Sequence, residues 1–267
     1  MTHIAEIISV GTELLLGNTT NTDARDIAQM LSELGINVYY QTVVGDNPDR
    51  IRDAVQTAFS RADLVITTGG LGPTKDDISK EVVMETLGFE PVLDKVTERI
   101  IRVWLRLTGT KEVAPEQLKQ AYVPKGGTIL RNKFGTAPGC AMEKDGKIGI
   151  LLPGPPREMK PMFETAVKKV LSQYANQTLV SVNIYTKDFL HAPVGIVGEW
   201  PVAEKISDLF DLADPTVATY AGKANCRIRV TSRGTDREDA HRKIDPIVED
   251  IVNRIGKEYI DHISDHD

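Results

Sequence analysis

Three closely spaced glycines lie in the stretch TTGGLGPTKDDISKE (67–81), where a short β-branched run ends and helical spacing begins. Gly69, Gly70 and Gly72 permit a tight turn in which backbone N–H groups approach a ligand without obstruction by Cβ atoms. The N-terminus of the following helix adds partial positive charge. The spacing therefore predicts a phosphate-binding loop.

Acidic residues surround this predicted anion site. Asp76 and Asp77 either cap the helix or ligate a divalent metal that accompanies a phosphate ester, and the metal explains the glycines and the acids together. Asp46 follows the second predicted strand in VVGDN, and Glu13 follows the first in VGTELLLGN. Alone, Asp46 is explained as a turn or N-cap residue and Glu13 as a solvated loop residue. Their convergence from three strand ends favours a metal-phosphate site.

Further loops end at the same predicted edge. Asn21 follows the first strand and either reads a ribose or base with its amide or caps the next helix. Two clusters rich in glycine and proline, NKFGTAPGCA (132–141) and LPGPPREM (152–159), would wall the same pocket. The residues that these loops offer to it are Gly135, Thr136, Pro153, Gly154 and Arg157. Arg157 either meets phosphate or lies in solvent.

The elements that must position these residues alternate between strand and helix. Strands are predicted over 4–11, 37–45 and 62–68, with helices over 22–34, 49–61 and 78–87. This alternation is typical of βαβ units around a mostly parallel sheet, where ligands bind at the carboxyl edge. We therefore expect an α/β fold with helices flanking a mostly parallel sheet.

The middle of the chain continues the first domain. Residues 92–122 are predicted as two helical pieces, separated at 108–110, in a lobe beside the sheet. Strands follow over 128–130, 139–144 and 147–153, and Asp145-Gly146 between the last two indicates a type I′ hairpin. A helix is predicted over 157–174.

A composition break at 172–178 marks a second domain. The pattern beyond it is strand, helix, strand, strand and helix, a small α+β unit of βαββα order. Its predicted elements are 178–186, 202–212, 216–222, 226–233 and 238–255. We expect domains at 1–174 and 175–260 and a frayed polar tail at 261–267.

Composition limits the kinds of partner. The net charge of −6 and the pI near 5.5 argue against an overall electrostatic grip on nucleic acid or anionic lipid. No apolar run reaches the length of a membrane span, and no signal peptide precedes the first strand, so we expect a cytoplasmic protein. Cys140 and Cys226 lie far apart without metal-ligand spacing and are predicted to be small buried residues.

Four segments together resemble a known family. GTELLLGNTTNTDARDIAQML, TTGGLGPTKDDISKE, GTAPG and LPGPPREM resemble the N-terminal domain of the CinA competence/damage-inducible proteins, a branch of the molybdopterin-binding (MoaB/MogA-like) fold, over residues 4–172. The βαββα segment resembles the family's KH-like domain. It has no G-x-x-G loop, so we expect no nucleic-acid partner. The family's nicotinamide mononucleotide deamidase domain would lie further on, and this chain ends before it.

The resemblance implies an activity and roles for particular residues. It implies an ADP-ribose pyrophosphatase that forms AMP and ribose 5-phosphate with a divalent metal (Mg, Mn or Co) and potassium. It assigns the two important acidic positions to Asp46 and Asp77 and the phosphate role to Thr68, Gly69 and Gly70. A metal bridging the diphosphate would neutralise charge and polarise phosphorus.

Two alternatives stay open. One is molybdopterin binding or adenylylation on the same fold, against which the loop GPTKDD weighs. The other is a non-catalytic nucleotide-binding scaffold. We also expect a homodimer, for which a contact through Trp200 is one hypothesis.

Overall fold

The computed structural model of the chain describes residues 4–109, 113–174 and 178–265. The chain divides into two compact units. Unit 1 comprises Met1–Ser32 and Ile36–Tyr174, and unit 2 comprises Ala175–Asp267 together with Glu33–Gly35. Among the described residues, no helix is both long and apolar enough to cross a lipid bilayer.

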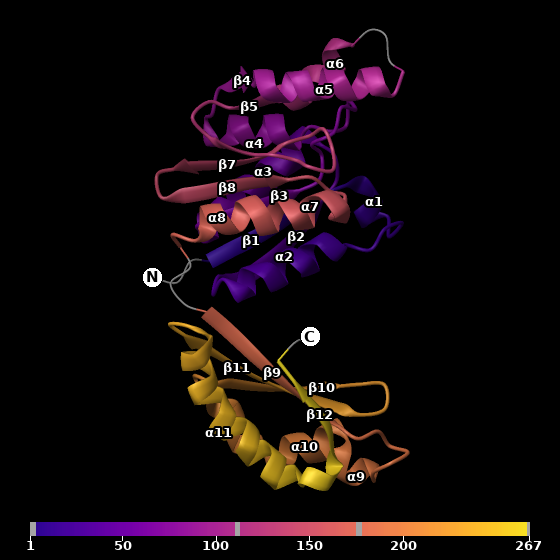
Figure 1. The fold of residues 1–267 in the computed structure, drawn as a ribbon, viewed down its shortest axis with the longest axis vertical. Helices are drawn as coiled ribbons and strands as arrows, with labels where there is room; N and C mark the ends of the chain where they lie inside the picture. The colour runs from indigo at the N-terminus through magenta and orange to yellow at the C-terminus, as the bar shows by residue number, and fades with distance from the viewer. Residues whose placement is uncertain (1–3, 110–112, 175–177, 266–267) are drawn as a thin grey trace. The chain divides into compact units, whose positions relative to one another are not determined.

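Unit 1 is built on a six-stranded sheet whose first four strands are parallel, which confirms the predicted fold class (Figure 1). The order is β2 (Asn37–Val44), β1 (Ile4–Val10), β3 (Leu64–Thr68), β8 (Lys147–Leu152), β7 (Gly139–Lys144) and β6 (Thr128–Leu130). Strands β1, β3 and β8 are buried along nearly their whole length, so apolar residues follow one another in them instead of alternating. Asp145 and Gly146, with φ of 53° and 74°, make the predicted left-handed turn between β7 and β8.

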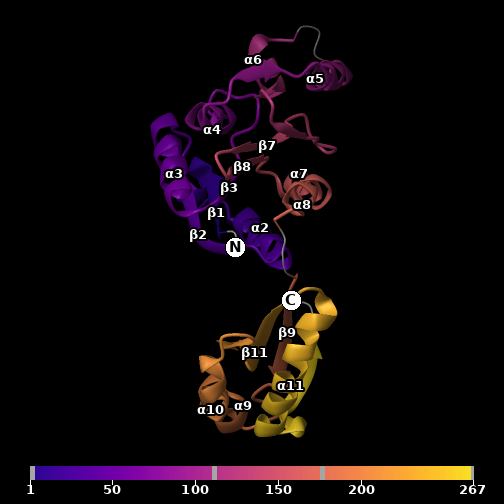
Figure 2. The ribbon, with the colours of Figure 1, turned by 90° about the vertical axis from the view of Figure 1, so that its left-hand side faces the viewer.

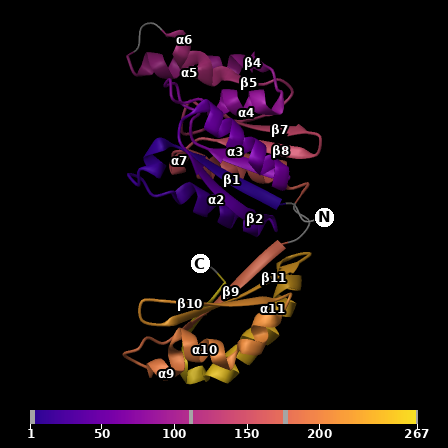
Figure 3. The same cartoon turned by 180° about the vertical axis from the view of Figure 1, so that it is seen from behind.

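Helices cover both faces of this sheet, as Figures 2 and 3 show from the side and from behind. Helices α3 (Pro48–Arg61) and α4 (Ser79–Leu87) cover one face; α2 (Thr22–Glu33), α7 (Pro156–Met162) and α8 (Lys168–Leu171) cover the other. Ile51 and Val55 of α3 and Val83 of α4 join the buried core above β1 and β3. Gly88 ends α4 with a left-handed φ of 69°, as its position predicts.

The predicted helix over 157–174 is not continuous. A π-helical segment, Phe163–Val167, separates α7 from α8, and the last helical residue is Leu171. Pro161 lies inside α7 and has no N–H group to donate, which weakens the helical hydrogen-bond ladder just before the π segment.

The lobe beside the sheet contains the two predicted helical pieces and a feature that the sequence did not reveal. The helices are α5 (Lys95–Leu107) and α6 (Pro115–Leu118), followed by the 3-10 turn η1 (Lys119–Ala121), while residues 110–112 lie outside the described residues. Strands β4 (Pro91–Leu93) and β5 (Tyr122–Pro124) pair antiparallel at the base of the lobe. Three-residue strands are too short to show an alternating pattern.

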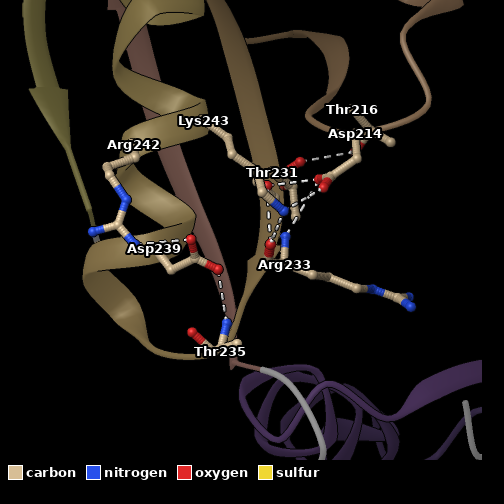
Figure 4. Close-up of polar contacts among 9 residues, drawn as sticks. Asp214, Thr216, Thr231, Arg233, Thr235, Asp239, Arg242 and Lys243 are labelled. Carbon is tan, nitrogen blue, oxygen red and sulfur yellow. Dashed lines mark hydrogen bonds and ion pairs between the residues drawn. The ribbon is translucent and has the colours of Figure 1, made fainter.

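Unit 2 is an antiparallel sheet with helices packed on one face. Its strand order is β10 (Thr216–Ala221), β11 (Cys226–Gly234), β9 (Thr178–Thr186) and β12 (Ile260–Ser264). Helices α10 (Glu199–Lys205) and α11 (Arg237–Ile255) supply Val202, Ile244 and Ile251 to its core. Polar contacts fix the turn from β11 into α11 (Figure 4). There Lys243 Nζ donates to Asp214 Oδ2 (2.8 Å) and to the Arg233 carbonyl oxygen (2.6 Å).

Two expectations for this unit are wrong. The predicted helix over 202–212 is not continuous, because the non-helical backbone of Ile206 ends α10 and a separate 3-10 turn (Ser207–Asp211) follows. Another short helix, α9 (Val194–Val197), precedes α10 where no helix was predicted. The tail predicted to fray at 261–267 instead contributes Asp261–Ser264 to β12, which pairs with the edge of β9; residues 266–267 lie outside the described residues. Backbone hydrogen bonds hold this strand, so its polar side chains did not signal it.

Candidate active site

All of the predicted site residues of unit 1 line one cavity of about 620 Å³. The cavity lies where β1, β3 and β8 end and the loops that follow them diverge, which is the edge at which parallel sheets bind ligands. The predicted residues that line this cavity are Glu13, Asn21, Asp46, Thr68, Gly69, Gly70, Gly72, Asp76, Asp77, Gly135, Thr136, Pro153, Gly154 and Arg157. The structure brings them together, and the role of each stays a prediction.

The glycines of the loop are required by packing as well as by any ligand. Gly69 and Gly70 have φ of 97° and 67°, which side chains rarely adopt. A Cβ on Gly69 would lie 3.3 Å from the carbonyl carbon of Val10 and closer to its oxygen. One on Gly70 would lie 3.0 Å from Ser79 Cβ and closer to its hydroxyl. A Cβ on either glycine would therefore point into the protein and not into the cavity.

Backbone donors nevertheless remain along this loop. The N–H of Gly69 is engaged by the carbonyl oxygen of Leu152 (3.1 Å). Within the described chain, no hydrogen bond engages the N–H groups of Gly70, Leu71 and Gly72. Successive N–H groups of this kind form an anion-binding concavity.

Thr68 and Asp23 form a buried pair at the floor of the cavity. Thr68 Oγ1 donates to Asp23 Oδ2 at 2.7 Å, so its proton is committed to the protein and not to a phosphate. Asp23 is only 7% exposed, and its Oδ1 has no partner among the described residues. Burial raises the pKa of Asp23, and the Thr68 hydrogen bond opposes that rise. Sequence reasoning missed Asp23 because an acid in the first turn of a helix is ordinary.

Asp46 ties the loop after β2 to the end of β1. Its Oδ2 accepts hydrogen bonds from the backbone N–H and the hydroxyl of Thr12, each at 2.8 Å. Thr12 begins α1 (Thr12–Leu15), one helical turn where the sequence suggested a loop. The carboxylate of Glu13 lies over Gly11, since a Cβ there would be 2.7 Å from Glu13 Oε2. Both acids thus belong to the lining of the cavity.

Asp76 and Asp77 are held by one threonine. Asp77 Oδ2 accepts from the N–H and hydroxyl of Thr74, at 2.9 and 2.6 Å, and the same hydroxyl is within reach of Asp76 Oδ1. This contact holds the pKa of Asp76 below its ordinary value. Lys119 of η1 donates to the carbonyl oxygens of Thr74 and Asp77, the latter at 2.5 Å. The lobe therefore fastens the acidic loop.

The acids fit a divalent metal only in combination with a substrate. No group of three histidine, cysteine or carboxylate side chains that could hold a metal occurs in the part of the chain that the structure describes. Thr12 donates hydrogen bonds to Oδ2 of Asp46, and Thr74 donates to Oδ2 of Asp77. The Oδ1 atom of each aspartate accepts no hydrogen bond from the described residues. One or two carboxylates together with phosphate oxygens and water is the usual arrangement for Mg²⁺.

Of the remaining predicted residues, Asn21 has a structural role and Arg157 is available to bind a ligand. Asn21 caps α2, since its Oδ1 accepts from Ala24 N (3.2 Å) and its Nδ2 donates to Ser9 Oγ (2.9 Å). Arg157, at the start of α7, is exposed and forms no ion pair with a described residue, so its guanidinium is available to an anion in the cavity.

Loop 132–137 has an organiser that the sequence did not reveal. Asn132 Oδ1 accepts from the N–H groups of Phe134 and Gly135, both at 2.9 Å. Its Nδ2 donates to the Ala137 carbonyl oxygen (2.9 Å) and to Glu158 Oε2 (2.7 Å). This one side chain therefore fixes the loop against α7.

The chain matches two family models. Residues 6–173 match one described as a probable molybdopterin binding domain, and residues 194–260 match the KH domain of damage-inducible protein CinA. A CinA-like protein of Kosmotoga olearia is 48% identical over 258 residues, which cover 96% of this chain and 60% of that protein. A putative competence-damage inducible protein of Clostridium beijerinckii is 45% identical over 253 residues, or 94% and 60% of the two chains. The chain thus spans about 60% of the length of these curated relatives.

A solved structure resembles part of this chain. The protein CinA of Thermoplasma acidophilum, whose function is described as unknown, shares 34% sequence identity and superposes with a TM-score of 0.56. The match covers 65% of this chain and 98% of that one.

Proposed function

This chain belongs to the CinA family, with a molybdopterin-binding-fold domain and a KH domain, and from that premise we propose that it hydrolyses the diphosphate bond of ADP-ribose to AMP and ribose 5-phosphate. The observation that carries the proposal is that one cavity is lined by residues 70–72, whose N–H groups bond to no described residue, by Arg157, and by the carboxylates of Asp46 and Asp77. Its volume is in the range of small-molecule sites.

Different groups of the chain would bind the diphosphate, hold the cation and accept a proton. The N–H groups of 70–72 and the Arg157 guanidinium would bind the diphosphate oxygens. The Oδ1 atoms of Asp46 and Asp77, together with phosphate oxygens and water, would hold a divalent cation, Mg²⁺, Mn²⁺ or Co²⁺. The three carboxylates that the sequence predicted as metal ligands, with Asp76 as the third, do not form such a group in the described chain. When bound, this cation neutralises the diphosphate and makes phosphorus more electrophilic. A Glu13 carboxylate oxygen would accept the proton of the attacking water.

The test is a screen of nucleotide sugars with each of the three metals, with and without potassium, and with products identified by mass. Asp46→Asn and Asp77→Asn are each expected to lower turnover at least ~10²-fold with the fold intact, because each removes a charge directed at the metal. Asp53→Asn is the matched control, since this exposed acid on α3 does not line the cavity. Near-normal rates in both cavity variants would refute the site.

A second function is favoured by the description of the matching family model. Molybdopterin binding or adenylylation would use the same cavity. Binding of a pterin, with no hydrolysis of ADP-ribose under any of the three metals, would favour it. Nucleotide binding without turnover would instead indicate a non-catalytic nucleotide-binding module.

A further inference from the structure

Two large aromatic side chains line the cavity but remain exposed to solvent. Phe134 lies on loop 132–137 and is 59% exposed, and Trp104 lies on α5 and is 51% exposed. Neither belongs to the buried core of unit 1. Exposed aromatic surface inside a concave site is characteristic of ligand contact.

The conformation that presents Phe134 is built into the fold. Asn132 accepts the N–H groups of Phe134 and Gly135 and anchors the loop to Ala137 and Glu158. These bonds hold the backbone that carries Phe134 at the cavity wall. A preorganised loop loses little conformational entropy when a flat ligand stacks on the ring that it carries.

Trp104 is presented by the amphipathic packing of α5. Ile101 and Leu105 of this helix are buried in the core of the lobe, which leaves the neighbouring Trp104 to face outward and line the cavity. The lobe thus adds an aromatic wall to a site whose glycine loop and acids come from the sheet. The polar and apolar groups occupy different elements of one cavity.

We propose that Trp104 and Phe134 form a base-binding subsite, which takes the aromatic base of a nucleotide while the loop 69–72 takes its phosphates. The inference rests on the proposed function and narrows its substrate to molecules that carry a flat base. Aromatic side chains stack on nucleobases through their faces, and each such contact contributes measurably to affinity.

The experiment uses the full chain and the two products of the proposed reaction. AMP and ribose 5-phosphate share a ribose and a phosphate, but only AMP has a base. The chain has two tryptophans, so Trp200→Phe leaves Trp104 as the only indole reporter, and Trp200 lies in unit 2 and is 78% exposed. Both ligands are titrated with Mg²⁺ by tryptophan fluorescence and by calorimetry.

We expect AMP to change Trp104 fluorescence saturably and ribose 5-phosphate to leave it unchanged. Phe134→Ala should weaken AMP binding by about 5- to 100-fold, the range for loss of one aromatic stacking partner, and change ribose 5-phosphate binding less than about twofold. Phe189→Ala, an exposed phenylalanine of unit 2, is the matched control and should alter neither affinity.

Three results would overturn the inference, and they separate it from the proposed function. AMP that binds by calorimetry, without a Trp104 response and with unchanged affinity in Phe134→Ala, would place the base elsewhere and leave the hydrolase proposal standing. An equal fluorescence response to ribose 5-phosphate would show that the signal does not come from stacking. If neither AMP nor ADP-ribose binds, the proposed function fails and the subsite fails with it.

Discussion

Gly72→Ala tests whether the position of the Asp77 carboxylate matters. A Cβ on Gly72 would lie 2.8 Å from Asp77 Cγ and 2.9 Å from Oδ1, and closer still to Oδ2. Ordinary contact begins at 3.4 Å, so the carboxylate has to move by about 0.6 Å or more. Gly72 does not have a left-handed φ, so alanine adds no backbone strain.

The variant should therefore separate activity from stability. The atoms in the way are the end of a short, half-buried side chain that can rotate, so we expect the free energy of unfolding to fall by less than about 1 kcal/mol. A displacement beyond ~0.5 Å exceeds the tolerance of catalytic groups, and a misplacement near 1 Å costs about 10²-fold in rate. ADP-ribose hydrolysis, followed by AMP release with Mg²⁺ or Mn²⁺, should fall by about 10- to 100-fold.

A double-mutant cycle tests the route of the effect. If Gly72→Ala acts through Asp77, then adding it to Asp77→Asn should lower the rate little further. Independent, additive losses would show that Gly72 acts otherwise, for example through its N–H group. Full activity in a folded Gly72→Ala protein would refute the placement of Asp77 in the reaction.

Two further predictions concern stability. Asp23→Asn should raise the free energy of unfolding at pH 7 by about 0.5–1 kcal/mol, because burial raises the pKa of Asp23 and disfavours its charged form. The gain should shrink as the pH falls toward 3.8 and Asp23 is protonated, and a less stable variant at pH 7 in thermal unfolding would contradict this reasoning. Asp94→Ala should cost about 1–2 kcal/mol at pH 7, since Asp94 pairs with Arg131 and caps α5 through Thr97 N (2.9 Å). Arg131 and Thr97 hold the pKa of Asp94 below 3.8, so denaturant unfolding should show a full difference above that pH and a smaller one in stronger acid; a difference independent of pH would count against the pair.

The sheet and the location of the cavity could be predicted because both follow from local patterns. Continuous apolar runs followed by glycine or acidic loops identified β1 and β3 and the edge where they end. Parallel pairing then brings together residues as distant as Glu13 and Arg157. Strand β12 was missed because its pairing depends on backbone groups of β9, which leave no mark on side-chain type.

The contents of the cavity were harder to predict because they depend on tertiary contacts. Helical spacing describes Trp104 as one more apolar residue of α5, and only the packing of Ile101 and Leu105 decides that it faces outward. Likewise, the sequence suggested that Gly70 makes space for an anion, whereas its missing Cβ makes space for Ser79. The sequence shows Asp23 only as an ordinary acid in the first turn of a helix, and its burial appears only in the structure.

The two hydrogen bonds of Lys119 give the lobe a mechanical role. Because its ammonium group bonds to the carbonyl oxygens of Thr74 and Asp77, a shift of η1 pulls directly on the backbone that carries the acidic loop. Trp104 belongs to the same lobe. A ligand that displaces α5 would therefore also displace Lys119 and the backbone to which Lys119 is hydrogen-bonded. Binding free energy from contacts far from the scissile bond can thus help to align the carboxylates. A substrate without a base would therefore react more slowly as well as bind more weakly.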